Sequence, residues 1–159
     1  MPDVYAIDHI DAAILDLFTV EPRIGVLEAS RRLHLARGTV QSRLDKLSAR
    51  GVVRGWGPDL DPAALGYPVT AFLTLEIDQP GHEEVGARLA GIPEVLEVLT
   101  ITGNGDLLCR VVARTNADLQ RVIDLVAHTQ GVARTSTVVA LATQVPHRVM
   151  PLVAEVADD

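Results

Sequence analysis

The chain has 159 residues, enough for one domain of ordinary size or two small ones. Apolar residues make up 48%, charged residues 22% and aromatic residues 3%, a composition typical of globular rather than disordered proteins. No apolar run approaches the roughly 18 residues of a membrane span, and the acidic N-terminal segment lacks the basic run of a signal peptide. The single cysteine, Cys109, excludes an internal disulfide, so we expect a protein of the reducing cytoplasm.

The net charge of −7 argues at first against a nucleic-acid partner, but its distribution reverses that impression. Eight basic and two acidic residues lie between Arg23 and Arg54, a local net charge of +6. Residues 56–159 carry six basic and fourteen acidic side chains, a net charge of −8. A positive region beside an acidic body predicts a protein that binds a polyanion on one face only.

Residues 1–51 are expected to form one domain of three short helices. Ile7, Ile10, Ile14 and Leu17 repeat at helical spacing, and Pro22 ends that helix. A second helix is expected from about residue 26 to 33. A third follows at 37–50, with Gly51 in the position just past its end.

Residues 52–68 are predicted to be a hinge strand and linker, because glycine and proline interrupt any long element. Val52 and Val53 would begin it in extended form, and Asp61-Pro62 would start a single helical turn. From 69 to 145 the pattern predicts strands at 69–77, 95–102, 107–113 and 132–144, with helices at 82–89 and 116–128. That β-α-β-β-α-β order indicates a ferredoxin-like fold, so the whole chain is assigned to the α+β class. Pro146 and Pro151 indicate a loosely specified tail at 146–159.

The third helix carries a basic stripe opposite an apolar one. At about 100° per residue, Leu44 and Leu47 fall near Val40, whereas polar and basic side chains gather on another side. Two helices joined by a short turn, the second with such a stripe, are typical of a helix-turn-helix that binds double-stranded DNA. The bland alternative is an ordinary solvated helix. The residues predicted to contact DNA are Arg31, Arg32, Arg37, Thr39, Ser42, Arg43, Lys46 and Arg50.

Several segments together resemble the Lrp/AsnC (leucine-responsive, or feast/famine) transcriptional regulators over about residues 7–145. In the first half these are Ile7–Leu15, Arg23-Ile24, Glu28, Leu33, Leu35, Arg43-Leu44, Leu47, Gly51–Trp56, Leu60–Pro62 and Leu65-Gly66. In the second half they are Gly103–Leu108, Gly131-Val132 and Thr135–Thr137. Three departures are visible. Ala36 stands where the family usually has a capping serine, and His34 where it has glycine. Gly105 stands where the effector turn of the family commonly has an aromatic residue.

The resemblance implies a helix-turn-helix followed by a ferredoxin-like domain that forms homodimers through its sheet and, in many members, octamers. It also implies a small effector, usually an amino acid, bound near the turn after the second strand. Carried over by position, that site comprises Thr102, Gly103, Asn104, Gly105, Asp106, Thr135 and Thr137.

The turn itself has two interpretations. Its glycine N–H groups and the Asp106 carboxylate suit a zwitterion, but Gly and Asp also form plain turns in which Asp bonds its own backbone. We expect no metal and no cofactor, because the histidines are scattered, and no catalytic motif points to an enzyme. The alternative function is a metabolite-binding or small catalytic ferredoxin-like module with a helical dimerisation arm.

Overall fold

The computed structural model describes residues 6–78 and 81–158 and divides the chain into two compact units. The first unit contains the chain up to Asp59 and again from Val145 onward. The second unit runs from Leu60 to Gln144.

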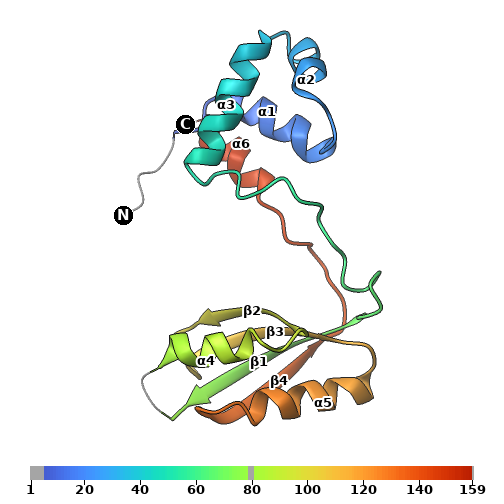
Figure 1. Cartoon of the computed structure of the whole chain (residues 1–159), viewed down its shortest axis with the longest axis vertical. Coiled ribbons are helices and arrows are strands. Elements are labelled where there is room, and N and C mark those ends of the chain that lie inside the picture. The colour runs from blue at the N-terminus through green and yellow to red at the C-terminus, as the bar shows by residue number, and fades with distance from the viewer. Residues whose placement is uncertain (1–5, 79–80, 159) are drawn as a thin grey trace. The chain divides into compact units, whose positions relative to one another are not determined.

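The first unit is helical, as the apolar periodicity predicts. Its helices are α1 (His9–Val20), α2 (Val26–Arg32), α3 (Arg37–Ala49) and α6 (Met150–Asp158) (Figure 1). Ile14, Ala29, Val40 and Leu44 form its buried cluster, each contributed by one of the first three helices. The three expected N-terminal helices are therefore confirmed.

Local hydrogen bonds set the ends of these helices. Asp8 caps α1, since its side chain accepts from the Asp11 N–H and the Asp11 side chain accepts in return from the Asp8 N–H. Gly51, at φ +74°, ends α3 in the left-handed conformation that glycine favours. The N–H groups of Val52 and Val53 then donate to the Leu47 carbonyl at 2.9 and 3.2 Å. These two residues close the helix, so the extended piece expected there is not formed.

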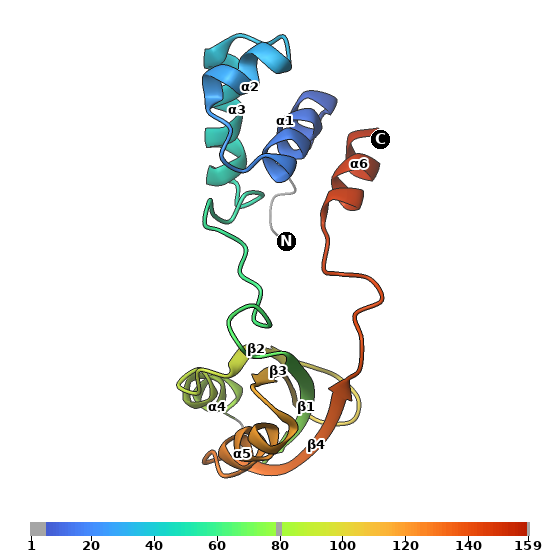
Figure 2. The ribbon, with the colours of Figure 1, turned by 90° about the vertical axis from the view of Figure 1, so that its right-hand side faces the viewer.

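The C-terminal segment differs from the expectation of a loose tail, because it forms α6 and belongs to the first unit. Pro151 misleads because proline usually breaks a helix. Here it lies in the first turn of α6, where its missing N–H would have had no partner within the helix. Helix α6 packs against α1 within this unit (Figure 2).

The second unit is a four-stranded antiparallel sheet with two helices on one face (Figures 1 and 2). The strand order is β2-β3-β1-β4, and the β-α-β-β-α-β succession confirms the ferredoxin-like fold. Its elements are β1 (Val69–Ile77), α4 (His82–Leu89), β2 (Val95–Thr100), β3 (Leu107–Ala113), α5 (Asn116–Ala127) and β4 (Val132–Ala140).

Strand β4 ends at Ala140 rather than continuing to residue 144. Ala140 pairs with Thr70 at the start of β1. Beyond that pair the neighbouring chain offers only Val69 and then Pro68, which has no N–H to donate. The apolar residues after Ala140 therefore have no strand to pair with, although their composition is that of a strand.

Alternation along the strands separates two faces of the sheet. Leu73, Leu75 and Cys109 are fully buried beneath α4 and α5, together with Leu89 and Val122 of those helices. Burial raises the pKa of the Cys109 thiol to about 11, as is typical of a small packing residue rather than a reactive one. The opposite face of the sheet also carries apolar side chains, namely those of Phe72, Leu99, Leu108 and Val138.

Helix α3 begins without a side-chain cap, because the residue before it is Ala36. We predict that Ala36→Ser raises the stability of the folded chain by about 1 kcal/mol, since a serine hydroxyl can accept from the Thr39 N–H. Thermal unfolding followed by circular dichroism should show a midpoint about 3 °C higher. Ala49→Ser in the last turn of α3 is the control and gains no such bond. Equal midpoints for Ala36→Ser and wild type would contradict the prediction that a serine at position 36 stabilises the start of α3.

Candidate DNA-binding and effector-binding sites

Helix α3 presents one row of polar side chains to solvent. Thr39, Ser42 and Lys46 lie three and four residues apart and are exposed, while Val40 and Leu44 face the core. Arg37 and Arg50, near the two ends of α3, are exposed as well. The predicted polar stripe is therefore a continuous accessible row, except at one position.

That position is Arg43, which is engaged within the protein. Its Nη1 donates to both carboxylate oxygens of Asp8 at 2.7 Å and to Asp11 Oδ1 at 2.8 Å. The Arg43 side chain is 24% exposed, and that of Asp11 is 1% exposed. The guanidinium thus joins the start of α1 to the middle of α3. The DNA contact predicted at Arg43 remains a prediction, but two carboxylates already hold this cation.

The electrostatics of this Arg43–Asp8–Asp11 cluster are mutually reinforcing. The hydrogen bond from Arg43 lowers the pKa of Asp8, and the bonds to Asp8 and Asp11 raise the pKa of Arg43. Asp8 and Arg43 are therefore both charged at neutral pH. In the sequence, this cluster is indicated by the two acids three residues apart at the start of α1. The prediction of DNA contacts does not take these acids into account.

Arg31 and Arg32 also form ion pairs, with nearby acidic residues on the surface of the first unit. Arg32 bonds to Glu21 and lies 3.5 Å from Glu28, which in turn lies 3.7 Å from Arg31. Among residues 6–78 and 81–158, neither Arg37 nor Lys46 takes part in an ion pair. The cations that remain available to a phosphate or a base edge on the helix-turn-helix therefore include Arg37 and Lys46.

Hydrogen bonds from Asp106 hold the predicted effector turn against the end of β1. The Asp106 N–H donates to the Leu75 carbonyl at 2.8 Å, and the Asp106 carboxylate accepts from the Ile77 N–H at 2.9 Å. The Ile101 N–H donates to the Asp106 carbonyl at 3.0 Å. Asp106 thus ties the turn to the end of β1, so at least one of its oxygens serves the fold.

The two glycines of the turn have different surroundings. Gly103 (φ +103°) and Gly105 (φ +110°) both adopt the left-handed region. A Cβ at Gly105 would overlap the Thr74 Cγ2 atom and lie 3.1 Å from the Leu75 carbonyl oxygen, whereas a Cβ at Gly103 meets nothing within 4 Å. Gly105 is therefore required by a close approach of the turn to β1.

Thr135 and Thr137 share one face of β4, as predicted, but β1 lies between them and the turn. Thr135 pairs with Leu75 and Thr137 with Leu73 on one side of β1, while the turn leads into β3 on its other side. Two strand spacings, about 10 Å, separate them from the residues beside Asp106. The two parts of the predicted effector site are therefore not brought together within one copy of the unit.

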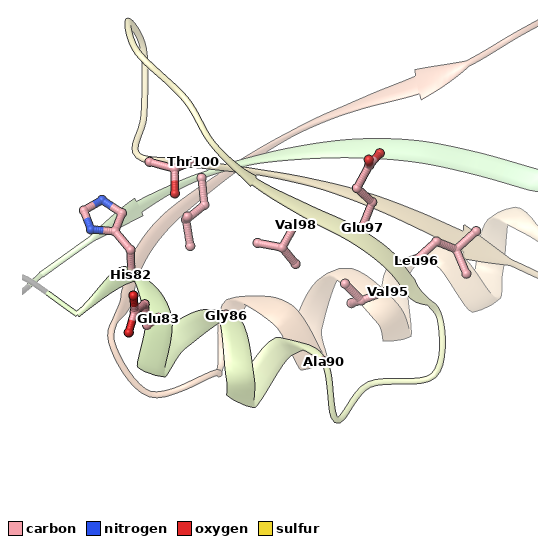
Figure 3. A pocket seen from close by; sticks show the side chains of 10 residues that line it. His82, Glu83, Gly86, Ala90, Val95, Leu96, Glu97, Val98 and Thr100 are labelled. Atoms are coloured by element: carbon pink, nitrogen blue, oxygen red, sulfur yellow. The ribbon is translucent and has the colours of Figure 1, made fainter. Parts of the chain in front are cut away.

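A groove of about 340 Å³ lies close to the turn, between α4 and β2 (Figure 3). Thr100 and Leu107, which line it, stand immediately before and after the segment that contains the turn. Sequence reasoning missed this groove, because its α4 wall is made by small side chains rather than by a motif. No three His, Cys, Asp or Glu side chains in the described part of the chain gather as metal ligands.

A helix-turn-helix with an exposed polar row, joined to a ferredoxin-like unit with a groove, is the architecture of a two-unit transcriptional regulator. An AsnC-type helix-turn-helix domain matches residues 7–48, and an Lrp/AsnC ligand binding domain matches residues 70–150. The chain belongs to the Lrp/AsnC family and is a DNA-binding transcriptional regulator with a ligand-binding domain. No helix within the described residues has the length and apolar character to cross a membrane.

Individual relatives agree with this assignment over nearly their full length. The HTH-type transcriptional regulator FL11 of Pyrococcus horikoshii is 30% identical over 92% of this chain and 97% of its own. E. coli AsnC matches with a TM-score of 0.84 at 25% identity, over 92% of this chain and all of its own. A feast or famine regulatory protein from M. tuberculosis, complexed with L-methionine, matches with a TM-score of 0.77 at 28% identity, over 89% of this chain and 96% of its own.

Removing Arg43 should reveal its structural role. We predict that Arg43→Ala lowers the free energy of unfolding by about 2 kcal/mol, because it takes the guanidinium away from the buried Asp11 carboxylate. Lys46→Ala, one turn along α3 and exposed, should change it by less than about 0.5 kcal/mol. Urea unfolding followed by circular dichroism measures both. An Arg43→Ala protein with a wild-type midpoint would show that Arg43 is not needed to hold α1 and α3 together.

The close approach at Gly105 gives a second prediction. Gly105→Ala should destabilise the second unit by about 2 kcal/mol, since it adds both backbone strain and an overlap with Thr74. Gly103→Ala carries the same kind of strain without the overlap and should cost about 1 kcal/mol. Urea midpoints of the two variants test this order. Equal losses would mean that the turn can shift away from β1.

Proposed function

We propose that α3 enters the major groove of DNA and that Thr39, Ser42 and Lys46 contact bases or phosphates there. The observation that carries this is the exposed row of polar side chains on α3, opposite the buried Val40 and Leu44. Arg37 and Arg50, together with Arg31 and Arg32 on the preceding helix, supply phosphate contacts. Arg43 acts as a positioning residue for the row rather than as a base contact.

We infer that the second unit forms a homodimer through the sheet face that α4 and α5 leave open. Phe72, Leu99, Leu108 and Val138 give that face an apolar surface, and Val138 is 64% exposed. A two-fold dimer presents two copies of α3 to a pseudo-palindromic site with half-sites about 34 Å apart. Assembly of dimers into octamers, as the family implies, is a further part of the proposal.

The effector of this chain is proposed to be an amino acid, bound at or beside the turn at residues 102–106. The relatives complexed with L-methionine, from M. tuberculosis and Neisseria meningitidis, support this class of ligand. The chain acts in the cytoplasm by binding rather than by catalysis. An effector with different affinities for two arrangements of the assembly would shift their populations and so change the spacing of the DNA-binding units.

The experiment is a titration of a labelled fragment of the protein's own upstream DNA at two salt concentrations, with excess competitor DNA. It is run with and without a pool of the twenty amino acids. The proposal expects competitor-resistant binding that weakens as salt rises, and a change in affinity with one or more amino acids. A wild-type protein that forms no complex at either salt concentration would overturn it.

Lys46→Ala provides the residue-level test. We predict about a tenfold loss of affinity and a salt dependence reduced by about one charge, because one cation leaves the interface. Arg134→Ala is the control, since it removes an exposed cation (78% exposed) from β4 of the second unit and should leave affinity unchanged. An equal effect of the two variants would indicate general electrostatics rather than a contact from α3.

A further inference from the structure

The chain carries one lysine, and this lysine lies on the exposed row of α3. Of the fourteen Lys and Arg residues in the sequence, Lys46 is the single lysine and the others are arginine. The two types differ chemically, because a lysine amine reacts with acyl donors, whereas a guanidinium stays protonated and does not. The one side chain of the sequence that can be stably acylated on nitrogen is therefore among the three that we place against DNA.

No acidic side chain holds the Lys46 ammonium group. In the part of the chain that the structure describes, Lys46 is exposed and takes part in no hydrogen bond or ion pair, in contrast to Arg43. The one acid of α3, Asp45, accepts instead from the Gln41 side chain at 2.8 Å. The residues three and four positions from Lys46 along the helix include the cations Arg43 and Arg50 and no acid. A reagent can therefore reach the amine without displacing a partner.

The charge around Lys46 favours a reagent that is an anion. Residues 23–54 carry eight basic and two acidic side chains, a local net charge of +6, whereas residues 56–159 carry a net charge of −8. A positive field that raises the local concentration of DNA phosphates does the same for a small phosphate-bearing molecule. Acyl phosphates are donors of this kind, because their activated acyl group is attached to a phosphate dianion. The field that attracts DNA to α3 therefore also attracts a reagent that removes its lysine charge.

We propose that Lys46 is a regulatory acetylation site, modified by an acyl phosphate while α3 is free of DNA. The Lys46 nitrogen, once it has lost a proton, attacks the carbonyl carbon of acetyl phosphate. A C–N bond forms, the C–O bond to the phosphate breaks, and phosphate leaves with the electron pair. The ammonium group gives up two protons, one to the departing phosphate and one to solvent. The product is a neutral amide, and nothing is oxidised or reduced.

Acetylation removes what Lys46 contributes to DNA binding. The amide carries no charge, so it no longer neutralises a phosphate. The second unit, residues 60–144, contains no lysine, so the same reagent leaves its sheet and its groove unmodified. DNA bound to α3 covers Lys46, so acetylation and DNA binding exclude one another. The inference rests on the proposed function of α3 and adds to it the regulation of that same surface.

The test treats the folded full-length protein with acetyl phosphate. Peptide mass spectrometry measures acetylation of Lys46, and titration of a labelled fragment of the protein's own upstream DNA measures affinity. We expect acetylation of Lys46, about a tenfold loss of affinity and a salt dependence reduced by about one charge. Prior binding to the same DNA should protect Lys46 from the reagent. Circular dichroism before and after treatment shows that the protein stays folded.

Lys46→Arg is the matched control, because it keeps a cation at this position but has no side-chain amine. The reagent can modify only its amino terminus, so the affinity of this variant, whatever its value, should be the same before and after treatment. Protein isolated from growing cells of its own organism should carry the acetyl group on Lys46 in a measurable fraction of chains.

Three results would overturn the proposal: no acetylation of Lys46 in the folded protein, undiminished DNA affinity after complete acetylation, or no acetylated Lys46 in protein isolated from cells. Failure of the α3 interface itself is recognised without the reagent. Untreated wild type that binds no DNA, or Lys46→Ala with the affinity of wild type, would refute that interface and the regulatory role with it. Weakened binding by Lys46→Ala together with undiminished affinity after acetylation would refute the regulatory role alone.

Discussion

The geometry of the DNA-binding unit depends on one guanidinium. Apolar packing among Ile14, Val40 and Leu44 holds α1 and α3 together, but such contacts are non-directional and allow one helix to rotate or slide against the other. The bonds from Arg43 to Asp8 and Asp11, all 2.7–2.8 Å long, are directional and charge-assisted. They fix the face of α3 that points outward. The exposed row available to DNA is therefore set by an interaction at the edge of that same row.

This arrangement also explains which parts of the unit the sequence could predict. The buried stripe of α3 follows from local periodicity, and so do the three N-terminal helices. Arg43 lies at the edge of that stripe, about 40° from Leu47 on a helical projection. A cation in this position can point toward solvent or toward a neighbouring helix. What decides its direction is the pair of carboxylates 32 and 35 residues earlier. A contact between distant segments leaves no periodic trace, so the sequence of this basic helix does not indicate that carboxylates hold one of its arginines.

The same limit affects a turn and small residues in the second unit, and a proline in the C-terminal segment of the first unit. The alternation of the strands predicts the ferredoxin-like order, because each strand buries one face. The turn sequence around Asp106 is compatible with both a ligand site and a plain turn, and neither interpretation predicts that the Asp106 carboxylate accepts from the Ile77 N–H at the end of β1. Pro151 indicates the interruption of a helix unless it is known that α6 begins just before it. The groove beside α4 arises from Gly86 and Ala90. In a sequence, small residues on a helix usually indicate close packing against a neighbour, and only the position of β2 shows that a groove is left there instead.

The charge distribution constrains how a ligand in the second unit can affect DNA binding in the first. A neutral amino acid carries one positive and one negative group, so it adds no net charge to the protein. Fields from the second unit are also screened beyond about 8 Å at physiological ionic strength. A ligand without net charge therefore has little electrostatic influence on the exposed row on α3. If the chain assembles as proposed, the coupling is geometric and requires a ligand that favours one arrangement of the copies over another. A groove at the free edge of β2, where one sheet ends, is a place where a bound side chain can alter what the next copy of the chain meets.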